Sequence, residues 1–220
     1  MIFLKKDTGL EHVVHKFDNL YDGIKKEAER YGDKLRYYYH ENGEEKTFTY
    51  NDMKTHVDYI AAGLTRLGVD GKFTCVTGDT HPDYVAVYEA VASTNGVIIP
   101  LDKDISNEQF TGFMQFCNTE VVFYTASQQK KINACLSELS LVKYFIAIGA
   151  DGSDFPNDPR FMSFANFFEV GKLIRGRGYP SCGEKCSRYG QDVRHHIHFR
   201  NDGNKQRRYA FPEKPRYGNA

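Results

Sequence analysis

The chain has 220 residues, which suits one domain or one and a half, and its 29 Lys and Arg equal its 29 Asp and Glu. Zero formal charge gives no general case for a nucleic-acid partner, and no apolar stretch is long enough to form an integral membrane segment. Five scattered cysteines without a signal peptide favour a reducing, cytoplasmic location over a disulfide framework. The charge is unevenly spread, because residues 1–174 hold 18 basic and 25 acidic residues, whereas residues 175–220 hold 11 and 4.

Taken in chain order, the hydrophobic pattern alternates between helical and strand periods. Apolar residues recur on one helical face in these stretches: 19–31, 50–67, 82–95, 106–117, 128–139 and 161–172. Runs of β-branched and aromatic residues predict strands at 35–39, 46–48, 73–77, 97–99, 121–124 and 144–148. The first two strands are predicted to form a hairpin, because Asn42-Gly43 supplies a positive-φ turn. Strands alternating with helices predict an α/β fold, a layered, largely parallel sheet with flanking helices and one main core.

Helix boundaries carry signals of their own. Thr49 with Asp52, and Ser106 with Gln109, fit the spacing of a capping box. Gly68 follows the last apolar residue of its helix and fits a helix C-terminus.

The pattern also predicts burial. Residues 97–99 are apolar without polar alternation, which is typical of a strand covered on both faces. In the helix that Ser106 begins, four residues are predicted to face inward: Phe110, Phe113, Met114 and Cys117. Three cysteines fall on apolar faces and are interpreted as core residues: Cys75, Cys117 and Cys135.

Three segments then occur in a characteristic order and spacing. They are Thr-Phe-Thr-Tyr-Asn-Asp at 47–52, the helical residues 61–69, and the stretch 72–102 that ends Gly-Val-Ile-Ile-Pro-Leu-Asp. In this order they resemble the opening of the AMP-forming adenylating enzymes, the superfamily of acyl-CoA synthetases, luciferases and peptide-synthetase adenylation domains. The resemblance covers residues 17–174, which it identifies as a partial AMP-binding domain after an N-terminal extension, 1–16.

The resemblance implies an ATP-dependent ligase that is most similar to long-chain acyl-CoA synthetases. In such an enzyme a carboxylate attacks the α-phosphate of ATP to give an acyl adenylate, and a thiol then displaces AMP. Catalysis is mostly positioning and charge stabilisation around the phosphates. ATP, Mg²⁺ and CoA are therefore implied for the intact enzyme, together with a small-molecule carboxylate as partner, and a carrier protein stays open as the thiol acceptor.

That chemistry needs a phosphate-binding loop, which in this family is rich in Ser, Thr and Gly and contains a lysine. Small residues let backbone N–H groups approach the phosphates closely. No such run exists in this sequence, and its expected place is taken by residues 200–208, whose bulky side chains prevent that approach. We therefore assign no catalytic, cofactor-binding or metal-binding residue, and we expect the chain as written to be inactive.

The genetic code offers an explanation of the missing loop. If the reading frame moves forward by one base, codons compatible with residues 199–208 can encode Ser-Gly-Thr-Thr-Gly-Thr-Ser-Lys-Gly-Val, which has the form of that loop. Residues 194–198 can likewise encode Gly-Thr-Ile-Phe-Ile, an apolar strand that leads into it. The charge balance turns after residue 174, so we interpret residues 175–220 as an out-of-frame basic tail without stable tertiary packing.

Two other interpretations of the tail stay open. Cys182 and Cys186 with His195, His196 and His198 could resemble a zinc cluster, although the spacing matches no standard finger. Lys, Arg and Tyr could also bind RNA. The alternative function is therefore a non-catalytic α/β scaffold whose basic tail binds nucleic acid or metal, and the coding DNA discriminates it from a synthetase fragment.

Two in-frame polar residues follow the strand at 73–77. Asp79 and His81 come at its carboxyl end, where α/β sheets bind ligands. The plainer interpretation, a loop residue and a helix cap, is the one we favour from the sequence.

Overall fold

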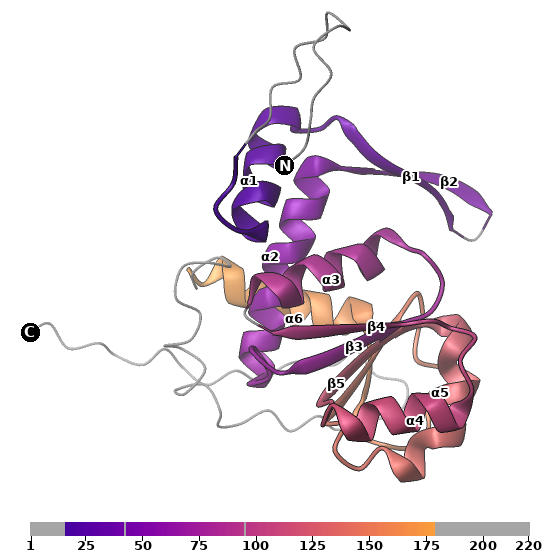
Figure 1. Ribbon diagram of the computed structural model, residues 1–220. Helices are drawn as coiled ribbons and strands as arrows, with labels where there is room; N and C mark the ends of the chain where they lie inside the picture. Colours follow the sequence, from indigo (N-terminus) through magenta and orange to yellow (C-terminus); the bar gives the residue numbers. More distant parts are fainter. Residues whose placement is uncertain (1–15, 42, 95, 179–220) are drawn as a thin grey trace, which may run out of the picture.

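Figure 1 shows the computed structural model of the chain, which describes residues 16–41, 43–94 and 96–178. The helices are α1 (Leu20–Tyr31), α2 (Tyr50–Leu67), α3 (Pro82–Ser93), α4 (Asn107–Phe116), α5 (Gln129–Cys135) and α6 (Phe164–Gly176). The strands are β1 (Leu35–Glu41), β2 (Glu44–Thr49), β3 (Phe73–Thr77), β4 (Val97–Leu101), β5 (Val121–Thr125), β6 (Tyr144–Ile148) and β7 (Phe161–Ser163). Short 3₁₀ turns flank α5, as η1 (Ala126–Gln128) and η2 (Leu136–Glu138).

The central feature is a five-stranded sheet in the order β4-β3-β5-β6-β7. All of its neighbouring strands run parallel. The chain enters the sheet at β3, steps outward to β4, and then returns past β3 to β5, so its direction reverses between β3 and β5. The antiparallel hairpin of β1 and β2 forms a separate two-stranded sheet. The predicted α/β class and its largely parallel sheet are confirmed.

Helices cover both faces of this sheet. On one face α1, α2, α3 and α6 pack together with strand residues such as Val76, Phe123 and Ile146. On the other face α4 and α5 pack over Val122 and Phe145. The predicted single core is therefore divided by the sheet into two clusters, because successive strand residues point to opposite faces.

The predicted local signals appear as structure. Thr49 with Asp52 and Ser106 with Gln109 each form a complete capping box, at the start of α2 and α4. Gly68 ends α2 in the left-handed conformation, with φ of 69°. These features depend on residues within four positions of one another, which is why the sequence predicts them well.

Three predictions of burial or type were wrong. β4 is an edge strand, so its apolar run is only partly covered and Val97 is 45% exposed. On α4, Phe110 and Met114 are buried, but Phe113 is 45% exposed and Cys117 is only half-buried. Cys75 and Cys135 are buried, as predicted. The predicted helix at 161–172 begins instead as β7, because Phe161 pairs with β6, and α6 starts at Phe164.

Helix α6 lies against α2 at unusually short range. A Cβ added at Gly171 would lie 1.9 Å from the backbone oxygen of Tyr59, and one at Gly63 would lie 2.7 Å from the ring of Phe167. Glycine is thus required on both helices for this approach. Beyond it, Arg175 lies 3.6 Å from the buried carboxylate of Asp58, so α6 continues past residue 174.

The hairpin is joined to the helical layer by one guanidinium group. Arg36 of β1 contacts Glu89 of α3 at 2.9 Å and Glu27 of α1 at 3.1 Å. Its guanidinium carbon also lies over the rings of Tyr37 and Tyr50. Burial raises the pKa of Glu89 above its ordinary value, against the attraction of Arg36.

Several predictions concern residues outside the described part of the chain. They are nearly all of the N-terminal extension, the cysteines and histidines of the zinc-like cluster, and the basic tail from residue 179 onward. No helix of the described part combines the length and the apolar character that crossing a bilayer requires.

Candidate functional site

The carboxyl ends of β3 and β5 form the candidate site, because ligands of open α/β sheets bind where the strand order reverses. β3 ends at Thr77 and is followed by Gly78, whose φ is +129°. β5 ends at Thr125. A Cβ at Gly78 would lie 2.0 Å from the Oγ1 of Thr125, so only glycine allows the two loops to approach this closely.

Hydrogen bonds connect these loops across the reversal point. The backbone N–H of Asp79 donates to the Oγ1 of Thr125 at 2.9 Å, and that oxygen lies 3.0 Å from the Oγ of Ser127. Lys103, which follows β4, donates to the Oδ1 of Asp79 at 2.7 Å. The Lys103 ammonium, and then the Ser127 hydroxyl, hold the pKa of Asp79 below its ordinary value.

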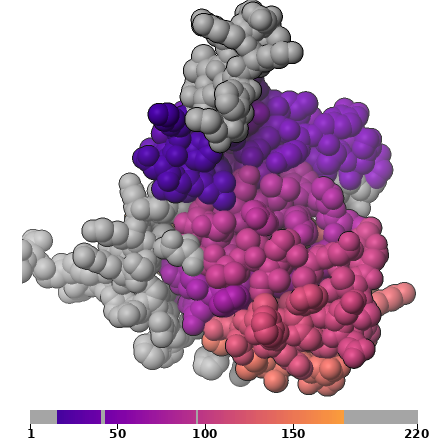
Figure 2. Space-filling view, viewed as in Figure 1, coloured from indigo at the N-terminus to yellow at the C-terminus, as the bar shows by residue number. Residues whose placement is uncertain are grey.

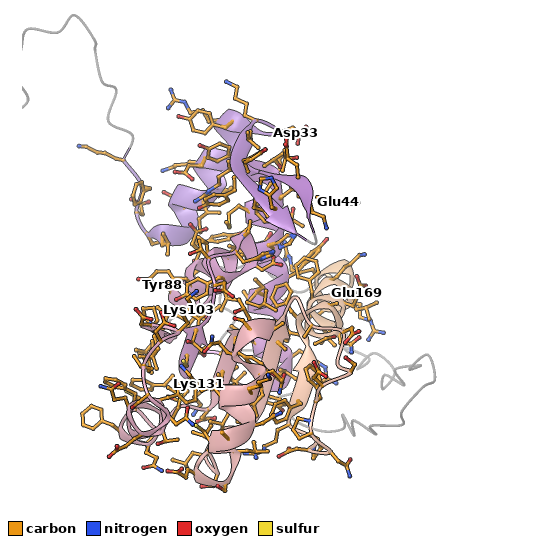
Figure 3. All side chains as sticks on the ribbon, turned by 90° about the vertical axis from the view of Figure 1, so that its right-hand side faces the viewer. Asp33, Glu44, Tyr88, Lys103, Lys131 and Glu169 are labelled. Carbon is orange, nitrogen blue, oxygen red and sulfur yellow. The ribbon has the colours of Figure 1, made fainter. Side chains whose placement is uncertain are left out.

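A second lysine supports the loop that carries Lys103. The ammonium of Lys131, at the start of α5, donates to the backbone oxygens of Lys103 and Ile105, the latter at 2.9 Å. Figure 3 labels Lys103 and Lys131 on this side of the molecule. The loop after β4 is therefore fixed by its own backbone, and Lys103 reaches Asp79 from a defined position.

The structure places the two polar residues that the sequence singled out in different roles. His81 is the N-cap of α3, and its Nδ1 accepts the backbone N–H of Asp83 at 3.1 Å. Asp83 also lies 2.6 Å from the Nδ1 of His56. The cap interpretation of His81 is confirmed, while Asp79 faces Lys103 at the sheet edge.

Sequence reasoning did not identify Lys103, Thr125 or Ser127. They follow two different strands, and only the strand order brings them together around Asp79. One signal was present, since Thr125 and Ser127 are polar residues directly after an uninterrupted apolar strand.

The described residues do not fit ATP or Mg²⁺. Of the two lysines at this edge, Lys103 is neutralised by Asp79 and Lys131 is bound to backbone oxygens, so neither ammonium is placed for a phosphate. In the described ranges there is also no group of three or more His, Cys, Asp or Glu side chains that could hold a metal ion. No reaction step can be assigned to these residues.

The fold and this edge define the class: a doubly wound, parallel α/β protein with a ligand-facing reversal point. Comparison with protein families is more specific. The model of the AMP-binding enzyme family matches residues 24–166, so the chain belongs to the AMP-binding enzymes.

Solved structures of acyl-CoA and related ligases share this fold. A protein from Rhodopseudomonas palustris CGA009, provisionally named a long-chain-fatty-acid CoA ligase, has a TM-score of 0.58 and 21% identity over 70% of this chain and 36% of its own. The inhibitor-bound N-terminal domain of FACL13 from Mycobacterium tuberculosis has a TM-score of 0.58 and 18% identity over 70% and 36%. The R395G form of coronafacic acid ligase from Pectobacterium brasiliense has a TM-score of 0.61 and 12% identity over 69% and 29%.

The chain therefore spans about a third of the length of the solved proteins that it matches. Among proteins with curated descriptions, none matches it significantly.

Proposed function

We propose that this chain is the N-terminal part of an AMP-forming acyl-CoA synthetase, an ATP-dependent ligase that activates a carboxylic acid and transfers it to CoA. The observation that carries the proposal is the family match over residues 24–166. The acyl-CoA ligases among the matched structures support this branch of the family. The reducing location that the cysteines favour would place the enzyme in the cytoplasm.

In the intact enzyme the reaction would proceed in two displacements. A carboxylate oxygen attacks the α-phosphorus of ATP, a P–O bond forms, and pyrophosphate leaves with the electrons of the bond that breaks. The thiolate of CoA then attacks the acyl carbon, and AMP leaves. Both steps require groups that hold and neutralise phosphates.

We further propose that the 220-residue chain does not catalyse this reaction. Its described residues do not fit the phosphates, and the loop that would bind them occurs only in the shifted frame of residues 199–208. Residues 17–174 would then be a partial AMP-binding domain and residues 175–220 an out-of-frame tail.

The test is ATP–pyrophosphate exchange with a panel of fatty and aromatic acids. Two proteins are compared: the 220-residue chain, and a frame-restored chain in which one base is corrected and the gene is read to its natural stop. We expect no exchange by the first and exchange by the second. Exchange by the 220-residue chain would refute its inactivity, and a frame-restored chain that is silent with every acid would contradict the synthetase assignment.

The alternative is a scaffold whose tail binds nucleic acid or metal. It predicts that the other frame closes soon after residue 208 and that the 220-residue chain retains RNA or zinc after purification. Sequencing of the coding DNA and metal analysis of the purified chain decide between the two.

A further inference from the structure

The outer side of β4 is an apolar surface that no described segment covers. Val97 is 45% exposed and its partner in register, Phe73, is 41% exposed. Ile98, Ile99 and Leu101 are only half-buried, although the run is as apolar as a central strand. In Figure 2 the segment that contains α3, β4 and α4, coloured in magenta, forms the middle of the visible face with no other described segment in front of it.

The backbone of this edge can accept another strand. Val97 turns its N–H inward, donating to the oxygen of Lys72 on the β3 side at 3.2 Å. Because successive residues alternate, Ile98 turns both its N–H and its C=O outward. Pro100 also faces outward and offers only its C=O, so pairing centres on Ile98.

The handedness of crossover connections shows which strand this edge should receive. The unit β3-α3-β4 crosses the sheet face that carries α3 and moves toward the β4 side. Helix α6 packs on that same face after β7, at the opposite end of the sheet. Parallel crossovers are right-handed in about 98% of cases, so the strand after α6 must also lie toward the β4 side of β7. The positions of β6, β5, β3 and β4 are filled, and among the described strands the next open place is the outer edge of β4.

The chain can reach that place. In the shifted frame, residues 194–198 encode the apolar strand Gly-Thr-Ile-Phe-Ile, 194 − 178 = 16 residues beyond Gly178, where the described part ends. An extended chain of that length reaches about 50 Å, whereas five strands spaced at about 4.8 Å span only about 24 Å.

We propose that, in the frame-restored enzyme, this recovered strand pairs in parallel with the outer edge of β4. The proposal rests on the proposed function, because it takes the shifted frame as the native one. The strand ends at the carboxyl edge of the sheet, where the recovered phosphate-binding loop begins. That loop would therefore emerge beside Leu101 and Lys103, next to the Asp79–Thr125 reversal point, which completes the site that the described residues leave without phosphate-binding groups.

Hydrogen–deuterium exchange followed by mass spectrometry tests the pairing directly. The peptide that covers residues 96–101 should exchange at least about tenfold more slowly in the frame-restored chain than in the 220-residue chain, since its outward amide becomes bonded. The peptide that covers β7 is the internal reference and should be unchanged. Equal exchange at 96–101, or new protection at β7 in its place, overturns the proposal.

A pair of variants provides an independent measurement. Val97→Lys places a charge on the β4 edge, and Leu141→Lys places one at a residue that is 51% exposed and lies before β6. Val97→Lys should lower the melting temperature of the frame-restored chain by at least about 3 °C and leave that of the 220-residue chain nearly unchanged. Leu141→Lys should be tolerated in both chains, and tolerance of Val97→Lys in both would contradict the pairing.

The outcome is separable from the proposed function. A frame-restored chain that protects β4 but fails every exchange assay would keep the strand position and reject the synthetase activity. An active chain with an unprotected β4 would do the reverse.

Discussion

The backbone N–H of Asp79 donates a hydrogen bond to the Oγ1 of Thr125, and this 2.9 Å contact joins the loop after β3 to the end of β5. It spans the point at which the strand order reverses. The contact exists because Gly78, with φ of +129°, brings the two backbones together where any side chain would collide.

Gly78→Ala should therefore be strongly destabilising. The new Cβ would meet the Oγ1 of Thr125 at 2.0 Å in a backbone conformation that L-residues rarely adopt, and we expect a loss of about 2–4 kcal/mol of unfolding free energy. Urea denaturation followed by circular dichroism measures it. Gly71→Ala is the matched control, because Gly71 has φ of +71° but open space around it, and it should lose only about 1 kcal/mol. Similar losses for both would mean that the contact with Thr125 contributes nothing.

The close approach of α6 to α2 gives a second prediction. Gly171→Ala places a Cβ 1.9 Å from the backbone oxygen of Tyr59 and must push the helices apart, so we expect a loss of about 2–4 kcal/mol. Gly176→Ala, in the last turn of the same helix, meets no atom within 4 Å and should be neutral or gain up to about 1 kcal/mol through helix propensity. Thermal and urea unfolding of the two variants should differ in sign or by several kcal/mol, and equal effects would refute the packing argument.

The Glu89 carboxyl group should make stability depend on pH. Burial raises its pKa above 4.5, so near and above that pH the folded state binds a proton more tightly than the unfolded state. The contribution of this group to stability is then present at low pH and declines as pH rises through the raised pKa. The free energy of unfolding of the wild type relative to Glu89→Gln should fall between about pH 4 and pH 7.

Arg36 sets how far this decline extends. Arg36→Met removes the cation 2.9 Å from Glu89, so the pKa of Glu89 should rise further and the decline should continue to higher pH. Glu169→Gln, at an exposed position on α6, is the control and should leave the pH profile unchanged. A wild-type profile parallel to that of Glu89→Gln would show that burial does not perturb Glu89.

The capping box of α2 gives the fourth prediction. Thr49→Ala removes the oxygen that accepts the N–H of Asp52 at 3.1 Å, and we expect a loss of about 1 kcal/mol of unfolding free energy. Thr47→Ala, at an exposed position on β2, should stay within about 0.5 kcal/mol of the wild type. Urea midpoints compare the two, and a Thr49→Ala protein as stable as Thr47→Ala would show that the cap is dispensable.

The sequence predicted features that neighbouring residues decide. The boxes at Thr49 and Ser106, and the strands β5 and β6, follow from side chains within a few positions, and all appear in the structure. The parallel sheet also followed, because its strands alternate with helices of the right length.

Features that depend on distant residues were harder to predict. The run at Val97 reads as a central strand, yet it lies at an edge because the next described strand returns to the other side of β3. Phe161 fits the helical period of the residues after it, and its pairing with Phe145 decides for a strand. In the candidate site, Asp79 was found from its place after a strand, but its partners Lys103 and Thr125 belong to other strands and could not be paired with it without the sheet order.

The pairing of α6 with α2 also sets the order of events during synthesis. α2 leaves the ribosome more than 100 residues before α6, so the groove around Gly63 stays open while β3 to β7 are translated. A nascent chain arrested before Phe164 would expose that groove and the apolar face of the sheet beneath it. Chaperone binding and aggregation of nascent chains should therefore drop sharply once translation has passed residue 176 and the whole of α6 has emerged from the exit tunnel.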